Sequence, residues 1–332
     1  MLPVIRTLQQ GLPGCRLTWI IGKSEYPLVE GLEGVEFIIF DKRAGWRAYA
    51  DLRRQLRGRR FDALLHMQAA LRASLISLLI RAPLRIGFDR ERADDAQWLF
   101  SNRKITTPPR RHVLDVFLGF AEALGVTTPV MRWDVPIPAS AREAMQARLA
   151  GPRPLLTINP CTSVRKRNYR NWHASHYAAV ADYASRELGY QVVLTGGPAD
   201  NEKQMAQAIM QAAETTPINL VGQTSIKELL AVLSLSELII APDTGPAHMG
   251  TAVGTPVIGL YVTSNPLRTG PYNDLDKVVN RYPDALENAF GKGVDEVDWG
   301  RRVRDPAAID LITVDEVTER LHRVTTALRA QA

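Results

Sequence analysis

The sequence predicts an α/β protein made of two doubly wound, Rossmann-like domains that face each other across a cleft. Short apolar runs alternate with segments of helical periodicity along almost the whole chain, as is typical of parallel βαβ construction. The length of 332 residues fits two domains of about 100–200 residues better than one. A Gly-Pro-Arg-Pro segment at 151–154 interrupts the pattern, so we expect one domain over 1–150 and another over 151–332.

Four apolar runs in the first half predict strands, at Arg16–Ile21, Glu36–Phe40, Asp62–Leu65 and Arg85–Phe88. Three amphipathic segments predict helices, at Trp46–Leu56, Ala70–Ile80 and Val113–Leu124. The chain opens with a helical pattern at Leu2–Leu8, whereas a doubly wound domain normally opens with a strand and a glycine-rich turn. Without that strand, backbone groups of the first sheet would stay unpaired, so we expect the first domain to be less stable than the second.

The second half repeats the alternation with more strongly apolar strands. These are predicted at Leu155–Asn159, Gln191–Leu194, Ile218–Val221, Leu238–Ala241 and Val257–Val262, buried on both faces. Helices are predicted between and after them, at His173–Leu188, Glu202–Ala213, Lys227–Leu235 and Ala247–Val253. Capping-box spacings at Ser140-x-x-Glu143 and Thr313-x-x-Glu316 predict the starts of two further helices.

Composition excludes several classes of protein. Hydrophobic residues make up 45% of the chain and charged residues 23%, which excludes disordered, collagenous and coiled-coil proteins. Two cysteines cannot build a disulfide framework, so a reducing compartment is expected. The first residues predict no signal peptide, and no window of about 18 uninterrupted apolar residues occurs, so we expect a soluble protein. A net charge of +6 without a run of basic residues favours an anionic substrate or membrane surface and no nucleic-acid partner.

The most specific segment runs from Leu238 to Tyr261. It predicts a buried strand, a turn at Asp243-Thr244-Gly245, a helix opened by a proline, and a second buried strand. Amide groups at that helix start form a ready anion site, and His248 lies one turn further on. The same pattern is also typical of a capped turn followed by a core histidine.

Two other turns follow predicted strands of the same domain. Gly196-Gly197 permits a close backbone approach, and Glu202 falls in the first helical turn, where it either complements the helix dipole or binds ribose hydroxyls. The segment from Asn159 to Trp172 carries four cations between positions 165 and 170, which suits a diphosphate or an ordinary solvated loop. Because carboxyl ends of parallel strands meet at one edge, we expect all three turns to converge on one pocket.

Other signatures are missing from the sequence. There is no G-x-G-x-x-G after a strand, no P-loop and no G-x-S-x-G elbow, which argues against dinucleotide enzymes, P-loop NTPases and α/β-hydrolases. His173 and His176 have a spacing that would let them share a metal, but an ordinary helix face explains them as well. Cys161 lies in the candidate site and is interpreted as a packing residue. We expect no metal and no cofactor.

Two segments carry a family resemblance. Ala241-Pro-Asp-Thr-Gly-Pro-Ala-His248 and Gly254-Thr-Pro-Val-Ile-Gly-Leu-Tyr261 resemble the glycosyltransferase family that includes the ADP-heptose:lipopolysaccharide heptosyltransferases. Asp62-Ala-Leu-Leu-His-Met-Gln68-Ala-Ala-Leu-Arg72 and Arg85-Ile-Gly-Phe-Asp89 are similar to that family's acceptor-side strands and loops. The resemblance implies an inverting, metal-independent enzyme of GT-B architecture that moves a heptose-type sugar from an ADP-sugar to the lipopolysaccharide inner core. The first domain would bind the acceptor and the second the nucleotide-sugar.

The resemblance also implies roles for individual residues. Arg170 would be the catalytic cation on the diphosphate. The donor-binding residues would be Thr162, Ser163, Glu202, Asp243, Thr244, Gly245 and His248. Acceptor contacts would come from Gln68, Arg72 and Arg92. The partners implied are a nucleotide-diphosphate sugar and the lipid A/core acceptor at a membrane surface, with the protein a cytoplasmic monomer, peripheral at the inner face of the inner membrane.

One departure from the family concerns the general base. The family's aspartate lies in the turn after the opening strand, ahead of Leu2, and in-line inversion needs a base on the acceptor hydroxyl. Asp89, Asp94 and Asp95 are the nearest carboxylates by sequence, with no physical reason to promote any of them. Either the start codon is assigned too late, or the chain is a nucleotide-sugar-binding protein without catalysis. A nucleotide-sugar epimerase or oxidoreductase lacks its dinucleotide fingerprint.

Overall fold

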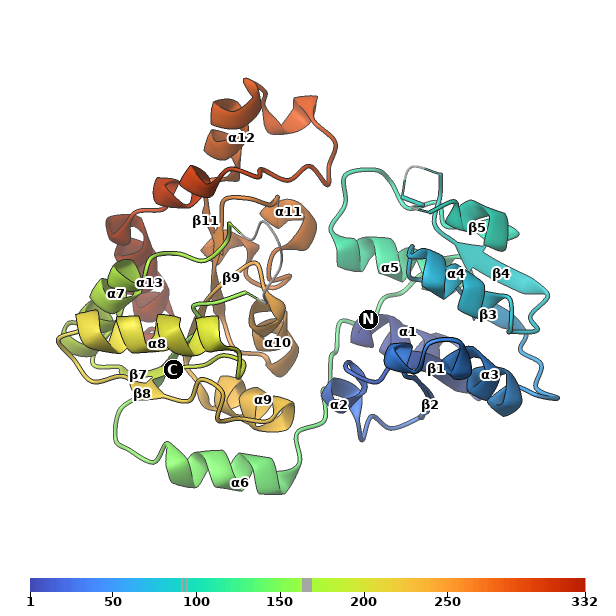
Figure 1. Cartoon of the computed structure of the whole chain (residues 1–332), viewed down its shortest axis with the longest axis horizontal. Helices are drawn as coiled ribbons and strands as arrows, with labels where there is room; N and C mark the ends of the chain where they lie inside the picture. Colours follow the sequence, from blue (N-terminus) through green and yellow to red (C-terminus); the bar gives the residue numbers. More distant parts are fainter. Residues whose placement is uncertain (91, 94, 163–168, 332) are drawn as a thin grey trace. The chain divides into compact units, whose positions relative to one another are not determined.

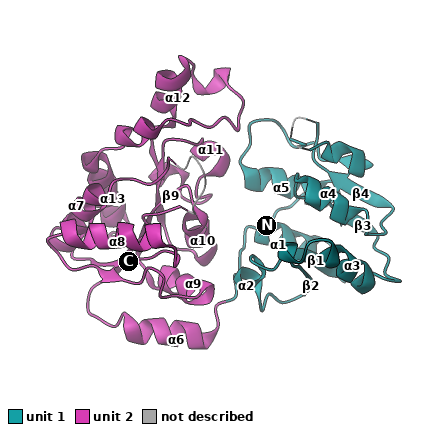
Figure 2. Ribbon diagram, in the orientation of Figure 1, with its two compact units in different colours: residues 1–136 teal, residues 137–332 magenta. Residues whose placement is uncertain are grey.

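The computed structural model describes residues 1–90, 92–93, 95–162 and 169–331, which form two compact units, Met1–Pro136 and Ile137–Ala332 (Figure 2). The division precedes helix α6 (Ala139–Arg148), whereas the sequence predicted it after residue 150. The reason is packing: Met145 and Leu149 are buried with Ala231 and Val232 of α9 (Ile226–Leu235). The predicted cap at Ser140 is wrong as well, because the N-cap of α6 is Pro138, two residues earlier, and it makes no side-chain cap hydrogen bond.

Unit 1 alternates helices and parallel strands (Figure 1). Its elements are α1 (Leu2–Gly11), β1 (Leu17–Gly22), α2 (Tyr26–Val29), β2 (Val35–Phe40), η1 (Lys42–Ala44), α3 (Trp46–Gln55), β3 (Ala63–Leu65), α4 (Leu71–Ser77), β4 (Leu84–Gly87), η2 (Gln97–Phe100), β5 (Arg103–Lys104) and α5 (Val113–Glu122). The predicted opening helix is confirmed as α1. The strands form two parallel sheets, β1-β2 and β3-β4-β5, rather than one continuous sheet among the described residues.

Unit 2 contains a six-stranded, fully parallel sheet in the order β11-β10-β9-β6-β7-β8. Besides α6 and α9, its elements are β6 (Leu155–Ile158), α7 (Ala174–Arg186), β7 (Gln191–Leu194), α8 (Asp200–Ala212), β8 (Ile218–Asn219), β9 (Leu238–Pro242), α10 (Gly245–Val253), β10 (Val257–Tyr261), α11 (Pro266–Thr269), η3 (Leu275–Lys277), β11 (Val279–Asn280), α12 (Tyr282–Phe290), η4 (Val294–Glu296), η5 (Pro306–Leu311) and α13 (Val314–Arg329). This is the order of a doubly wound sheet, and the direction of winding reverses between β6 and β9.

Alternation along the strands builds a core on each face of this sheet. Leu156 and Ile158 pack with residues of α7, α8 and α13, whereas Leu155 packs against α6 and α9. Every residue of β6, β9 and β10 is buried, as predicted for strands covered on both faces. The strands are therefore fixed from both sides, and the loops at their carboxyl ends start from rigid positions.

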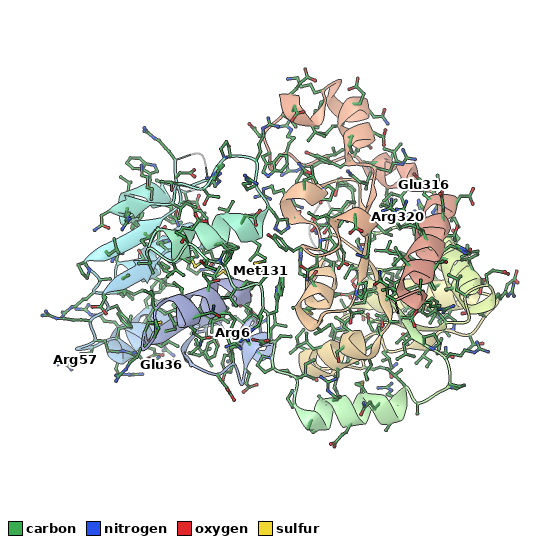
Figure 3. The ribbon with its side chains drawn as sticks, turned by 180° about the vertical axis from the view of Figure 1, so that it is seen from behind. Arg6, Glu36, Arg57, Met131, Glu316 and Arg320 are labelled. Carbon is green, nitrogen blue, oxygen red and sulfur yellow. The ribbon has the colours of Figure 1, made fainter. Side chains whose placement is uncertain are left out.

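The final helix closes one face of unit 2. Its predicted capping box is confirmed, because the Thr313 hydroxyl accepts the Glu316 amide while the Glu316 carboxylate accepts the Thr313 amide. Glu316 and Arg320 both project from α13, where Glu316 pairs with Arg281 and Arg320 donates to the Asp276 carbonyl (Figure 3). No helix among the described residues combines the length and the apolar character needed to cross a membrane.

We predict that unit 1 is less stable than unit 2. Most large apolar side chains that are exposed lie in unit 1, and β1 is only partly buried, whereas β9 is buried throughout. Native-state hydrogen exchange should give amides of β1 and β3 an opening free energy on the order of 2 kcal/mol lower than that of amides in β6 and β9. Equal protection of the two units would contradict this prediction.

Candidate functional site

The candidate site of unit 2 lies at the carboxyl edge of its sheet, on both sides of the point where the winding reverses. The loops after β6, β7, β9 and β10 all start at this edge, because the strands are parallel. Asn159, directly after β6, donates its side-chain amide to the Thr195 carbonyl, directly after β7, at 2.9 Å. Ligands of doubly wound sheets bind at this location.

A buried carboxylate joins three of these loops. Asp243 follows β9 and accepts the Ser264 hydroxyl from the loop after β10 at 2.7 Å. Arg170, from the loop after β6, donates to the Asp243 carbonyl at 2.7 Å and lies 3.6 Å from the carboxylate. A second guanidinium, that of Arg302, lies 3.9 Å from the same carboxylate. Two cations around one carboxylate leave a net positive charge, which suits a ligand with several negative charges.

The two guanidinium groups differ in their surroundings. The Arg170 side chain is only 14% exposed, whereas that of Arg302 is 44% exposed. Arg170 also holds its position through a backbone carbonyl, so its orientation is better defined than that of Arg302. Electrostatic interactions made by Arg170 are therefore less screened by water.

The start of α10 is open to a ligand. Thr244 is its N-cap and makes no side-chain cap hydrogen bond, and Pro246 occupies the first turn. Gly245 is exposed, so no side chain stands between solvent and the backbone at the positive end of the helix dipole. His248 lies one turn further on in α10 and is accessible to solvent, and its part in donor binding stays a prediction.

Glu202 folds back onto the glycine turn that follows β7. Its carboxylate accepts the Gly197 amide at 2.6 Å from the first turn of α8. A Cβ atom at Gly196 would lie 3.0 Å from that carboxylate, so the two glycines permit its close approach. The structure thus shows a local contact between the first turn of α8 and the glycine turn, and the ribose contact stays a prediction.

The segment after β6 is anchored at both described ends. Thr162 is buried, and both its amide and its hydroxyl donate to Asn171 Oδ1, at 2.9 and 3.1 Å. The buried Trp172 indole donates to the Ile312 carbonyl at 2.9 Å. Ser163 and the cations at 165–167 lie outside the described residues, so Arg170 alone represents the four cations predicted between positions 165 and 170.

Ser264, Arg302 and Asn171 were not predicted from the sequence. Ser264 follows β10, the parallel neighbour of β9, and that position was the only signal that could have found it. Arg302 lies far along the chain from Asp243 in a segment without a motif, so no local pattern indicated it.

The buried Tyr261 stays neutral beside Asp243. Burial and the Asp243 carboxylate raise the pKa of Tyr261 well above its usual value, and the neutral hydroxyl donates to the Thr269 carbonyl.

We predict that Cys161 resists alkylation in the folded protein. Burial, with a smaller contribution from Glu202, raises its pKa to about 12, so the thiolate is scarce at neutral pH. Iodoacetamide should label the exposed Cys15 and spare Cys161, and a denaturant should expose both. Mass spectrometry of the peptides measures this, and rapid labelling of Cys161 in the native protein would contradict its packing role.

Gln68, Arg72 and Arg92 lie in unit 1 on segments that follow neighbouring parallel strands. The Gln68 carbonyl accepts the Gln97 side-chain amide at 3.4 Å, and Arg72 is exposed on α4. Arg92 forms an ion pair with Asp89 and donates to the Pro108 carbonyl at 2.6 Å. Their role in binding an acceptor stays a prediction.

Two of the three candidate bases already have structural partners. Asp89 pairs with Arg92 and also accepts its amide at 3.0 Å. Asp95 accepts the amide of Leu71 at 3.0 Å, at the start of α4. Asp94 lies outside the described residues. Neither described aspartate is identified as the base.

The histidine pair of α7 does not form a metal centre in the part of the chain that the structure describes. His173 Nε2 lies 2.6 Å from Asp310 and is exposed. Burial lowers the pKa of His176, and the neighbouring His173 lowers it further. No described group of three His, Cys, Asp or Glu side chains is arranged to hold a metal ion.

Comparison with known proteins matches residues 49–291 to the model of glycosyltransferase family 9 (heptosyltransferase). The lipopolysaccharide core heptosyltransferase OpsX of Haemophilus influenzae is 38% identical over 323 residues, which are 97% of this chain and 92% of that protein. A family 9 glycosyltransferase from Veillonella parvula superposes with a TM-score of 0.78 at 22% identity, covering 98% of this chain and 92% of the other. The E. coli heptosyltransferase WaaC with ADP superposes with a TM-score of 0.72 at 18% identity, covering 97% and 94%. These superpositions confirm the predicted fold class.

Proposed function

Because the chain belongs to glycosyltransferase family 9 and is therefore a glycosyltransferase, we propose that it transfers a heptose-type sugar from an ADP-sugar to the inner core of lipopolysaccharide. The OpsX relative, named for lipopolysaccharide core heptosyl transfer and alike over almost the whole chain, supports this substrate class. The observation that carries the donor side is the Asp243 carboxylate flanked by Arg170 and Arg302 beside the open start of α10.

We place the donor in unit 2 and the acceptor in unit 1. The diphosphate would bind to Arg170, Arg302 and the backbone amides at the start of α10, since these provide positive charge and hydrogen-bond donors at one edge of the sheet. Glu202 would bind the adenosine ribose, exchanging its contact with Gly197. The E. coli relative solved with ADP supports an adenine nucleotide as the carrier.

In this proposal, transfer is an in-line displacement at the anomeric carbon with inversion. The acceptor hydroxyl gives its proton to a general base and its oxygen forms the new bond, while the bond to the diphosphate breaks and its electron pair leaves with the ADP. Arg170 stabilises the negative charge that develops on the departing phosphate, which is a transition-state interaction and therefore raises the rate. Thr162 keeps the strand-end segment that carries Arg170 in place through Asn171.

The acceptor is lipid-linked in this proposal, so the chain would work at the inner face of the inner membrane, on the cytoplasmic side. It would work there as a monomer. Gln68, Arg72 and Arg92 would contact the phosphorylated inner core, because the exposed Gln68 amide and Arg72 guanidinium and the partly buried Arg92 guanidinium suit an anionic saccharide. The net charge of +6 would favour the approach to an anionic surface.

We predict that the transfer rate does not depend on a divalent metal. Arg170 and Arg302 supply the positive charge that a metal ion would otherwise provide to the leaving diphosphate. Adding EDTA to the transfer assay should leave the initial rate within about twofold of the untreated rate, well below the effect of losing a catalytic charge. Loss of activity with EDTA and its return with one added metal would contradict this prediction.

The test of the proposed function is transfer itself. Incubating the chain with ADP-heptose and heptose-deficient lipopolysaccharide should increase the acceptor mass by one heptose and release one equivalent of ADP. ADP-mannose and UDP-glucose serve as donor controls. ADP binding by calorimetry without any transfer would contradict the enzymatic proposal and support a nucleotide-sugar-binding protein instead.

A further inference from the structure

Unit 1 exposes a ridge of large apolar side chains on α4 and η2. Along α4 and its C-cap, the exposed positions are Arg72 and three leucines, Leu71, Leu75 and Leu78, which are 51%, 43% and 62% exposed. Their spacing places the leucines on one helix face. On η2, Trp98 is 39% and Leu99 63% exposed. We call these five apolar residues the α4 ridge. A helix that turns leucines outward departs from the usual amphipathic arrangement and marks an interaction surface.

The α4 ridge sits on a fixed platform. Arg85 of β4 is partly buried and donates to the Ser77 carbonyl and to the Ile80 carbonyl, at 2.8 and 3.0 Å, where α4 ends. Its Nε donates to the Phe100 carbonyl at the end of η2, at 3.0 Å. At the other end of α4, Asp95 accepts the Leu71 amide. Arg85 therefore ties α4 and η2 to the same strand, so the exposed leucines do not belong to a loose loop.

Cations predominate among the exposed charged residues of the segment that carries the ridge. Between positions 71 and 104, the described exposed charged residues are one carboxylate and five cations, namely Asp95, Arg72, Arg81, Arg90, Arg103 and Lys104. The Arg90 guanidinium lies 5.4 Å from the centre of the Trp98 ring. A tryptophan with a cation on its ring suits a water–hydrocarbon boundary, because one end of the pair is apolar and the other polar.

We propose that the α4 ridge docks unit 1 on an anionic lipid bilayer. The leucines and Trp98 would enter the headgroup–acyl boundary, while the surrounding cations bind lipid phosphates. A second copy of the chain fits less well, since its own cations would face those of the first. The inference deepens the proposed function, on which it rests for the lipid-linked acceptor. Docking would hold Gln68 and Arg72, at the start of α4, beside the saccharide of that lipid.

The experiment measures vesicle binding without either substrate. The full chain should co-sediment with phosphatidylethanolamine–phosphatidylglycerol vesicles, weakly with phosphatidylcholine vesicles, and less at high salt. The double variant Leu78→Ser/Leu99→Ser should bind the anionic vesicles at least about tenfold more weakly, since two apolar side chains no longer enter the boundary. Trp46→Ser is the matched control, because Trp46 is 75% exposed in unit 1 but lies on α3, and it should bind as the unchanged chain does.

Three results would overturn the inference. These are no binding of the unchanged chain to anionic vesicles, equal binding of the double variant and the control, or a dimer without lipid that the double variant dissociates. Unchanged thermal unfolding shows that the variants are folded. Transfer to a core oligosaccharide without acyl chains separates the two proposals: the double variant should retain it, and loss only with vesicle-embedded acceptor supports docking. Absence of transfer to both acceptors, with vesicle binding intact, would reject the proposed function and leave the docking surface standing.

Discussion

Replacing Asp243 with alanine should lower kcat/KM for sugar transfer by about 10²-fold or more, the loss typical of removing one preorganised polar group from an active site. The Asp243 carboxylate is buried, accepts Ser264, and lies beside the guanidinium groups of Arg170 and Arg302. Without it, Ser264 loses its acceptor and both cations lose the carboxylate beside them, whereas Arg170 keeps its bond to the backbone carbonyl. Steady-state rates with ADP-heptose and calorimetry with ADP measure the effect.

The matched control for this variant is Asp310→Ala. Asp310 is also in unit 2 and also pairs with a basic residue, but its side chain is 61% exposed and distant in sequence from the three turns. It should change kcat/KM by less than about twofold, as expected for an exposed pair. Asp243→Asn retains the side-chain shape and the Ser264 contact, so its kcat/KM should lie between those of Asp243→Ala and Asp310→Ala. Equal activities of Asp243→Ala and Asp310→Ala, with both proteins folded, would remove Asp243 from the site.

Replacing Arg170 with methionine should lower kcat by about 10²–10³-fold, with a smaller effect on ADP binding, because the charge on the leaving diphosphate grows in the transition state. In the Arg302→Met variant, kcat should fall only about tenfold, since the more exposed Arg302 interacts through a higher effective dielectric. Arg170→Lys should recover part of the rate, as it retains the charge but loses the planar hydrogen-bonding geometry. Single-turnover rates separate the chemical step from binding.

Arg186→Met controls for the loss of a cation from unit 2. Arg186 pairs with Glu214 and its side chain is 51% exposed, so its removal should leave transfer unchanged. If Arg302→Met were as damaging as Arg170→Met, the two guanidinium groups would share the role. If Arg170→Met retained full kcat, the assignment of the catalytic cation would be wrong.

The unit 2 fold and its candidate site followed from local sequence. Apolar runs such as Leu238–Ala241 and Val257–Val262 predicted strands, because a strand covered on both faces of its sheet consists mainly of apolar residues. Once the strands are parallel, their carboxyl ends share one edge, and the turns at Asp243 and Gly196 are brought there by topology alone. The turn Asp243-Thr244-Gly245, in which Gly245 has no side chain, then predicted that the backbone amides at the start of α10 are open to a ligand.

What the sequence did not reveal depends on contacts between distant segments. Ser264 and Arg302 reach Asp243 across loops without a local signature, and Asn171 is identified only by its hydrogen bonds to Thr162. The start of unit 2 was placed too late, because glycine and proline at 151–154 mark a turn, whereas the packing of α6 decides the unit. The sequence predicted Arg85 as part of a strand, and only the hydrogen bonds of the folded chain show that it fixes α4.

The proposed donor site requires that the diphosphate of an ADP-sugar binds between Arg170 and Arg302 at the start of α10. A crystal structure of the chain with ADP tests it most directly. We predict diphosphate oxygens within hydrogen-bonding distance of the Arg170 guanidinium and of a backbone amide in the first turn of α10, with the ribose beside Glu202. A diphosphate bound elsewhere in unit 2, beyond hydrogen-bonding distance of both guanidinium groups, would contradict it.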